Sequence, residues 1–241
     1  MILRRKPLLL ISGLTAAVLA TAGIADTVLE HTVQQRIAQA AGCQLRPSGP
    51  VTADLSGSLA GLRVLGGDLG TVRIDADQVR RDGVDANVAA VLNGVTTDGA
   101  ITGGTATATI GYAQLQRQLA AQEPDLVLGG DGSRLTATGT VDGIPLPLTV
   151  DIAVSTTPSS LTATPTGITV LGRTIPVSKL SALPGASSLS GQLKPRTVAL
   201  PTMPDGVRLT AAHPDSTGLA LVLAIPAGHP GTATPGCPRV D

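Results

Sequence analysis

The hydrophobic pattern of this chain changes its period from two to 3.6 between Ile101 and Leu119. Small and β-branched residues alternate up to Ile110, as they do in a half-buried strand, and helical spacing follows at once. The apolar residues of the strand are Ile101, Ala106, Ala108 and Ile110, and those of the helix are Tyr112, Leu115 and Leu119. The residues of the helix expected to face water are Gln114, Gln116, Arg117 and Gln118. A strand that turns directly into an amphipathic helix gives a curved sheet an apolar body to wrap around.

The core of this chain must be aliphatic, because Tyr112 is its only aromatic residue and it has no Phe or Trp. Hydrophobic residues make up 42% of the 241 positions and charged residues 14%, which argues for a packed core and against disorder. The 29 Gly and 18 Pro, with abundant Thr and Val, favour turns and strands. We therefore expect one β-rich domain, a class that commonly reaches ~200–250 residues.

The charges of the chain are balanced, with 17 basic and 17 acidic side chains and no basic stripe of the kind that binds phosphate backbones. The Phe and Trp platforms on which single-stranded bases stack are absent as well. Nucleic acid is therefore not an expected partner.

Residues 1–25 have the pattern of an export segment. Three basic residues at positions 4–6 precede a run without charge that ends at Ala25, and small residues near its end suit cleavage of a signal peptide. The same run also lies at the lower limit of ~17–25 residues for an uncleaved membrane anchor. In both cases the body of the protein is expected to be exported, at the outer face of the plasma membrane, in the cell envelope or outside the cell.

Residues 26–41 are expected to form an amphipathic helix that Asp26 caps and Gly42 ends. Cys43 follows this helix, and the only other cysteine is Cys237, in the Pro/Gly-rich tail 226–241. Two cysteines in an exported protein most often form a disulfide, which here would join the first helix to the tail.

The segment 69–79 alternates like a strand, with Val72 and Ile74 on one side and Arg73, Asp75 and Asp77 on the other. Its carboxylates lack the D-x-D-x-D-G spacing of a calcium loop. A solvated strand face with paired charges explains them better.

Two further strands are predicted at LTATGTV and PLPLTVDIAV, joined by the hairpin dipeptide Asp142-Gly143. The second of these contains Leu146, Leu148 and Val150 in alternation. Later strands are expected over 161–171, 172–177, 207–210 and 219–225, with a short helix or irregular crossover within 178–195.

No catalytic constellation can be assembled from this sequence. No serine lies in a G-x-S-x-G elbow, and the cysteines and histidines lack paired metal-ligand spacing. The chain is therefore predicted to be no enzyme, with no catalytic residues, no metal and no cofactor. Apolar surface without a catalytic group can instead hold acyl chains, since each buried methylene contributes ~0.8 kcal/mol.

Four motifs in a fixed order resemble one known family. They are LGTVRIDADQVRRDGV, LNGVTTDGAITGGTATATIGYAQL, LTATGTVDGIPLPLTVDIAV and GITVLGRTIPV, preceded by the export segment and its helix. The chain resembles, over about residues 28–225, the actinobacterial secreted lipid-binding family typified by the mycobacterial lipomannan elongation factor. The resemblance implies a tubular lipid-binding fold with an apolar groove. The chain departs from the family in having no Phe or Trp, also within 61–67.

We therefore expect an α+β fold, in which a strongly curved, mostly antiparallel β-sheet wraps around the N-terminal amphipathic helix and one or two short helices and encloses an apolar groove. The expected domains are an export segment at 1–25, a lipid-binding domain at 26–225 and a tail at 226–241. The residues expected to line or flank the groove are Val72, Ile74, Ile101, Ile110, Tyr112, Leu115, Leu119, Leu146, Leu148 and Val150.

The expected function is non-enzymatic binding, with or without transfer, of phospholipid or a related envelope lipid in support of cell-envelope assembly. The expected partners are a phospholipid or other acyl-chain lipid and a membrane surface, and the sequence does not identify protein partners. The alternative is an envelope scaffold that recruits other proteins through exposed sheet edges and has no lipid ligand. An envelope hydrolase would require a buried Ser or Asp beside a base.

Overall fold

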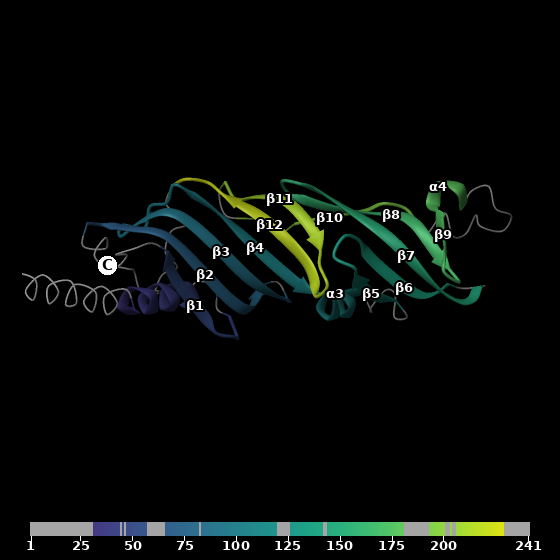
Figure 1. Cartoon of the computed structure of the whole chain (residues 1–241), viewed down its shortest axis with the longest axis horizontal. Helices are drawn as coiled ribbons and strands as arrows, with labels where there is room; N and C mark the ends of the chain where they lie inside the picture. The colour runs from purple at the N-terminus through teal and green to yellow at the C-terminus, as the bar shows by residue number, and fades with distance from the viewer. Residues whose placement is uncertain are drawn as a thin grey trace, which may run out of the picture.

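The computed structural model describes residues 31–43, 45, 47–56, 66–81, 83–119, 126–141, 144–180, 193–200, 203 and 206–228. Most of these residues lie in antiparallel strands, which confirms the expected strand-rich, mostly antiparallel architecture. The strands form two open sheets that follow one another along the long axis of the molecule (Figure 1).

The first sheet has six strands in the order β1-β2-β3-β4-β12-β11. Strands β1 to β4 follow the chain as a meander, and the β11–β12 hairpin returns from the end of the chain to pair β12 with β4. The bounds are β1 Val51–Ser56, β2 Asp68–Arg81, β3 Val84–Thr96, β4 Gly103–Gly111, β11 Arg208–Pro214 and β12 Gly218–Ile225.

The second sheet has the order β10-β8-β7-β6-β5, and β9 pairs with β8 beside β10. The bounds are β5 Val127–Gly130, β6 Leu135–Val141, β7 Ile144–Thr157, β8 Ser160–Val170, β9 Arg173–Pro176 and β10 Arg196–Ala199. The expected hairpin of two alternating strands is present as β6 and β7, whereas its turn residues Asp142 and Gly143 lie outside the described part of the chain.

The strand-to-helix switch is present: β4 leads directly into α3, Tyr112–Leu119, at the boundary between the sheets (Figure 1). One detail of the prediction is wrong, because Gln114 does not face water. It is only 9% exposed, and its Nε2 donates a 3.0 Å hydrogen bond to the carbonyl of Gly83 between β2 and β3. Helical periodicity gave no sign of this contact, since the acceptor belongs to a distant turn.

Two separate apolar clusters lie at opposite ends of the molecule. Residues 31–43 are helical, and Ile37 of this helix packs against β1 and β2. The helix continues through Cys43, so Gly42 does not end it as expected. The buried members of this first cluster are Ile37, Ala53, Leu55, Leu69 and Val72. The second cluster lies under α4, Val177–Leu180, and consists of Ala137, Leu148, Val150, Ile168 and Leu180.

The expectation of one continuous curved sheet is wrong, since the strands divide into two open sheets. The division follows from the pairing of β12 with β4, which places the C-terminal hairpin at the edge of the first sheet. The strand β5 then begins a new sheet after α3. Alternation in a sequence identifies strands and their faces, but it does not choose the neighbour of each strand.

Among the described residues, no helix has both the length and the hydropathy needed to cross a bilayer. The expected export segment, the N-cap at Asp26 and the tail beyond residue 228 lie outside the described residues. The first residues of the tail are described, and Gly228 pairs with Ile101 through two backbone hydrogen bonds of 2.8 and 2.9 Å.

Candidate functional site

One face of the first sheet is aliphatic across its strands. Paired residues of antiparallel strands point to the same face, so the register alone defines rows of side chains. All members of three adjacent rows are aliphatic or Gly: Leu55, Val72, Leu92, Gly104 and Ile225 in the first, Ala53, Ile74, Ala90, Ala106, Leu223 and Leu209 in the second, and Val51, Ala76, Val88, Ala108, Leu221 and Ala212 in the third. We call this surface the apolar face.

The opposite face of the same sheet is mixed and polar. The row that starts at Asp54 continues through Arg73, Val91, Thr105, Ala224 and Arg208. Two ion pairs lie on this face: within β2, Arg73 Nε is 3.3 Å from Asp75 Oδ2, and between β2 and β3, Arg80 Nε is 3.5 Å from Asp85 Oδ1. Such exposed pairs contribute little stability, ~0–1 kcal/mol each, and keep this face in water.

The apolar face is covered unevenly. At the β1–β2 edge, Val72 is 1% exposed beneath the helix 31–43. Towards β3, β4 and β12 many aliphatic residues are only half-buried by the described part of the chain, whereas Ala106 of β4 and Leu219 of β12 are buried. The half-buried residues are Val88, Ala90, Leu92, Ala108, Ile110, Leu221, Leu223 and Ile225. Half-buried aliphatic side chains in adjoining rows form the kind of surface that binds another apolar body.

The second sheet has its own apolar face, which α4 closes at one end. Leu148 and Val150 of β7 pack there with Ile168 of β8, which is 1% exposed, and with Leu180 of α4. Half-buried residues extend this cluster, namely Leu126, Leu128, Ile152, Val170, Ile175, Val177 and Leu193.

Tyr112 lies where the two sheets meet. Its hydroxyl donates a 2.7 Å hydrogen bond to the carbonyl of Asp215, in the turn between β11 and β12. On its other side lies Gly130 of β5, where an added Cβ would overlap the phenol oxygen. Burial, followed by the negative charges of Asp215 and Asp131, raises the pKa of Tyr112 above its usual value of 10.0. The side chain thus connects β4, β5 and the β11–β12 turn as an uncharged hydrogen-bond donor.

The two carboxylates near Tyr112 each fix a turn. Asp131 Oδ1 accepts hydrogen bonds of 2.8 Å from Ser133 N, Ser133 Oγ and Arg134 N, and these bonds, the backbone donor of Ser133 foremost, lower the pKa of Asp131 to about 2. Asp215 Oδ1 accepts from Thr217 Oγ1, Thr217 N and Gly218 N, which lowers the pKa of Asp215. These are Asx turns, so both carboxylates have structural partners.

The predicted site residues fall into three groups in the structure. Val72 and Ile74 belong to the apolar face beside the helix 31–43, and Ile110 lies on the same face of β4, paired with Leu219. Leu148 and Val150 belong to the cluster of the second sheet. Tyr112 and the half-buried Leu115 lie at the boundary, and Ile101 is buried beside Gly228. Leu119 is the last residue of α3 and Leu146 lies in β7, and the side chains of both are outside the described part of the chain.

Sequence reasoning missed the residues that join these groups. Gly130, Asp215 and Gln114 link elements that are far apart in the chain, and pairwise spacing could not reveal them. Only the turns at Asp131 and Asp215 could have been predicted from the sequence, because D-G-S and D-S-T-G are typical of Asx turns.

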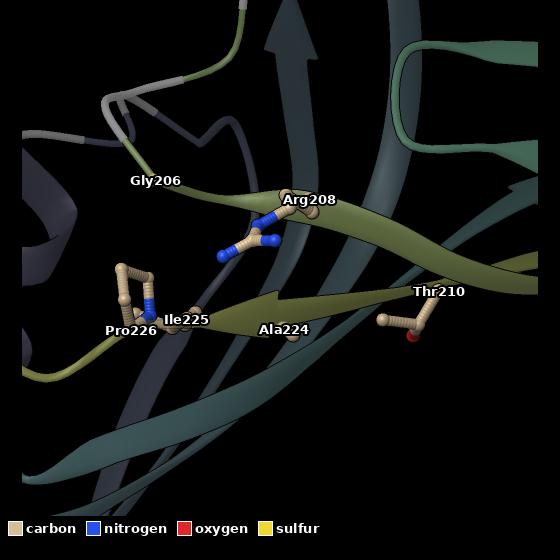
Figure 2. A pocket seen from close by; sticks show the side chains of 6 residues that line it. All are labelled: Gly206, Arg208, Thr210, Ala224, Ile225 and Pro226. Carbon is tan, nitrogen blue, oxygen red and sulfur yellow. The ribbon is translucent and has the colours of Figure 1, made fainter.

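Two hollows of the described surface contain none of the predicted site residues. The smaller, of about 200 Å³, lies at the end of the β11–β12 hairpin, where Arg208 extends over Pro226 and Gly206 (Figure 2). The larger, of about 500 Å³, lies between β11 and strands β7, β8 and β9. Its charged lining consists of Arg134 and Asp151, which lie 3.9 Å apart, beside His213. No group of metal-ligating side chains occurs among the described residues.

A comparison with protein families gives one match. The model of a family described as LmeA-like phospholipid-binding matches residues 24–224, which run from before the first described helix to the penultimate residue of β12. No curated protein and no solved structure matches the chain.

Proposed function

Because this chain belongs to the LmeA-like phospholipid-binding family, we propose that it binds phospholipid, or a related envelope lipid, at the apolar face of the first sheet. The acyl chains lie on the half-buried aliphatic rows of β3, β4 and β12, and the head group stays at the rim in water. No bond is made or broken. The protein works outside the plasma membrane and supports assembly of the envelope, in keeping with its N-terminal pattern of basic and then apolar residues.

The observation behind this proposal is the half-burial of Leu92 in the first row and of Val88, Ala108 and Leu221 in the third. Aliphatic residues of a finished core would be buried, as Val72 and Ala76 are at 1% exposure. An acyl chain that covers such rows gains ~25 cal/mol per Å² of apolar area removed from water, so binding needs no specific polar contact. In this proposal the helix 31–43 and α3 flank the groove.

Native mass spectrometry of the purified protein, before and after incubation with anionic phospholipid vesicles, tests the proposal. We expect lipid of defined mass to be bound to the protein. Recovery of wholly lipid-free protein that takes up no lipid from the vesicles would contradict the proposal.

Neighbouring alanines of β3 provide a matched pair of variants. Ala90 lies in the second apolar row, and Ala89 pairs with Asp75 and Thr107 on the opposite face. The substitution Ala90→Trp should fill the groove and remove most bound lipid, whereas Ala89→Trp should leave it. Equal lipid loads in the two variants would place the lipid elsewhere.

The alternative function, a scaffold that recruits proteins through a sheet edge, has one observation in its favour. The edge strand β10 is exposed at all four residues, with Val198 at 59%. Partners that co-purify with Ala90→Trp as well as with the wild type would favour the scaffold, because that variant fills only the apolar face.

A further inference from the structure

The turn between β8 and β9 presents a leucine to solvent. Val170 pairs with Arg173, so Leu171 and Gly172 form a two-residue hairpin turn. The side chain of Leu171 is 79% exposed, which exceeds the exposed fractions of Val198 and of Val127 at 56%. This turn lies at the far end of the second sheet, the end that also bears β9 and α4 (Figure 1).

The backbone makes leucine an unfavourable choice for this position. Leu171 has φ 50° and Gly172 has φ 77°, and a hairpin turn with two positive φ values prefers Asn-Gly or Gly-Gly. A Cβ at positive φ costs free energy, and exposure of the isobutyl group costs more. Both costs fall on one side chain, whereas glycine at this position would remove both.

The chain segment that carries the turn is basic, and one of its cations, Arg173, is next to the turn. The sequence has no acidic residue between Asp151 and Asp205, although acids and bases are balanced over the chain as a whole. The basic residues of this interval are Arg173, Lys179, Lys194 and Arg196, and all four are exposed. Arg173 flanks the turn, and Lys179 lies in α4, which follows β9. Arg196 pairs with Ala163, towards the other end of β8. An apolar side chain next to a cation matches the interface of a bilayer with anionic head groups, where the apolar side chain enters the apolar layer and the cation stays with the phosphates.

We propose that the β8–β9 turn docks the protein on an anionic membrane surface, with Leu171 inserted below the head groups and Arg173 bound to phosphate. This inference rests on the proposed lipid binding, because a protein that takes phospholipid from a bilayer must first contact the bilayer. The β8–β9 turn thus binds a membrane surface, and the lipid bound at the apolar face is a separate ligand.

Flotation of the full-length exported protein with phosphatidylglycerol-containing vesicles tests the docking. Leu171→Gly is the main variant, since glycine suits the positive φ and the fold should gain stability. We expect about tenfold weaker vesicle binding, the order of magnitude for loss of one leucine from an apolar environment. The control is Val198→Thr, which removes another exposed aliphatic residue from β10 and should float like the wild type. Unchanged flotation of Leu171→Gly, or equal loss in the control, would overturn the proposal.

The charge requirement is tested with Arg173→Gln. We expect roughly fivefold weaker binding to anionic vesicles, the contribution of one cation near a charged surface, and no change on purely zwitterionic vesicles. Equal effects on both kinds of vesicle would contradict the role of Arg173.

A second readout separates docking from lipid binding. Lipid is offered either in vesicles or as detergent-dispersed monomers, and uptake is measured by native mass spectrometry. Leu171→Gly should take up monomeric lipid normally and take it from vesicles more slowly. Wild-type protein that docks on vesicles but binds lipid in neither form would refute the proposed function and leave the docking intact. Normal extraction from vesicles by Leu171→Gly would refute the docking and leave the function intact.

Discussion

The hydroxyl of Tyr112 donates a 2.7 Å hydrogen bond to the backbone carbonyl of Asp215, across 103 positions of the chain. This bond attaches the first turn of α3 to the β11–β12 turn, and the phenol oxygen also lies against Gly130 of β5. One side chain thus contacts both sheets at their boundary.

Removal of that hydroxyl should weaken the boundary. We expect Tyr112→Phe to lower the free energy of unfolding by about 0.5–1.5 kcal/mol, because the carbonyl of Asp215 loses a partly buried partner. Urea titration followed by circular dichroism measures the change. A variant as stable as the wild type would show that water replaces the phenol without cost.

The space beside Tyr112 should admit only glycine. A Cβ on Gly130 would overlap the phenol oxygen and lie 2.9 Å from the carbonyl oxygen of Asp215. We expect Gly130→Ala to cost about 1–3 kcal/mol of stability, the usual range for overpacking. The adjacent Gly129→Ala is the control, because its Cβ would meet only Thr136 Oγ1 at 3.3 Å. Equal melting temperatures of the two variants would contradict the proposed crowding.

The ionisation of Tyr112 can be followed without interference, since it is the only aromatic residue. Its pKa is raised above 10.0 by burial and by the charges of Asp215 and Asp131. The stability contributed by the neutral phenol should be present below pH 10 and be lost as the pH rises through the higher folded pKa. Ultraviolet titration should give a midpoint above the one measured in urea. Coincident midpoints would show that the phenol is solvated.

Protonation of Asp131 should contribute to the loss of stability in acid, because the pKa of this residue is lowered from 3.8 to about 2. A depressed pKa contributes stability above the unfolded value, and this contribution is lost as the pH falls from about 4 to 2. Asp131→Asn should therefore be less stable than the wild type at neutral pH and equally stable near pH 2. A stability difference that does not change over this interval would argue against the ionised turn.

The predicted disulfide between Cys43 and Cys237 can be tested in solution. We expect the purified protein to contain no free thiol and to lose at most about 4–5 kcal/mol of stability on reduction, the limit of the chain-entropy model for a long loop. Thiol titration and thermal melts, with and without reductant, measure both. The variant Cys43→Ser should behave like the reduced protein. Two reactive thiols in the oxidised protein would disprove the pairing.

Several local features could be predicted because they depend on neighbouring residues. The switch at Tyr112, the polar face with Arg73 and Asp75, and the paired strands β6 and β7 follow from the period of side chains along a strand or helix. The motifs also led to the family, which the match over 24–224 confirms.

The partners of each element could not be predicted in this way. Gln114 was expected in water because helical spacing places it away from Tyr112, Leu115 and Leu119, yet its side chain donates a hydrogen bond to the carbonyl of Gly83. Val72 and Leu148 share an alternating pattern, but they pack in different clusters.

The sequence by itself determined that this protein is built from antiparallel strands with an aliphatic interior, because residue type and spacing set the faces of each strand. Only the tertiary structure decided that β12 pairs with β4, that the strands divide into two sheets and that Tyr112 joins them. These choices depend on contacts between segments more than a hundred residues apart. The free energy of such a contact depends on the shapes of both segments, so the hydrophobic period of one segment alone does not predict it.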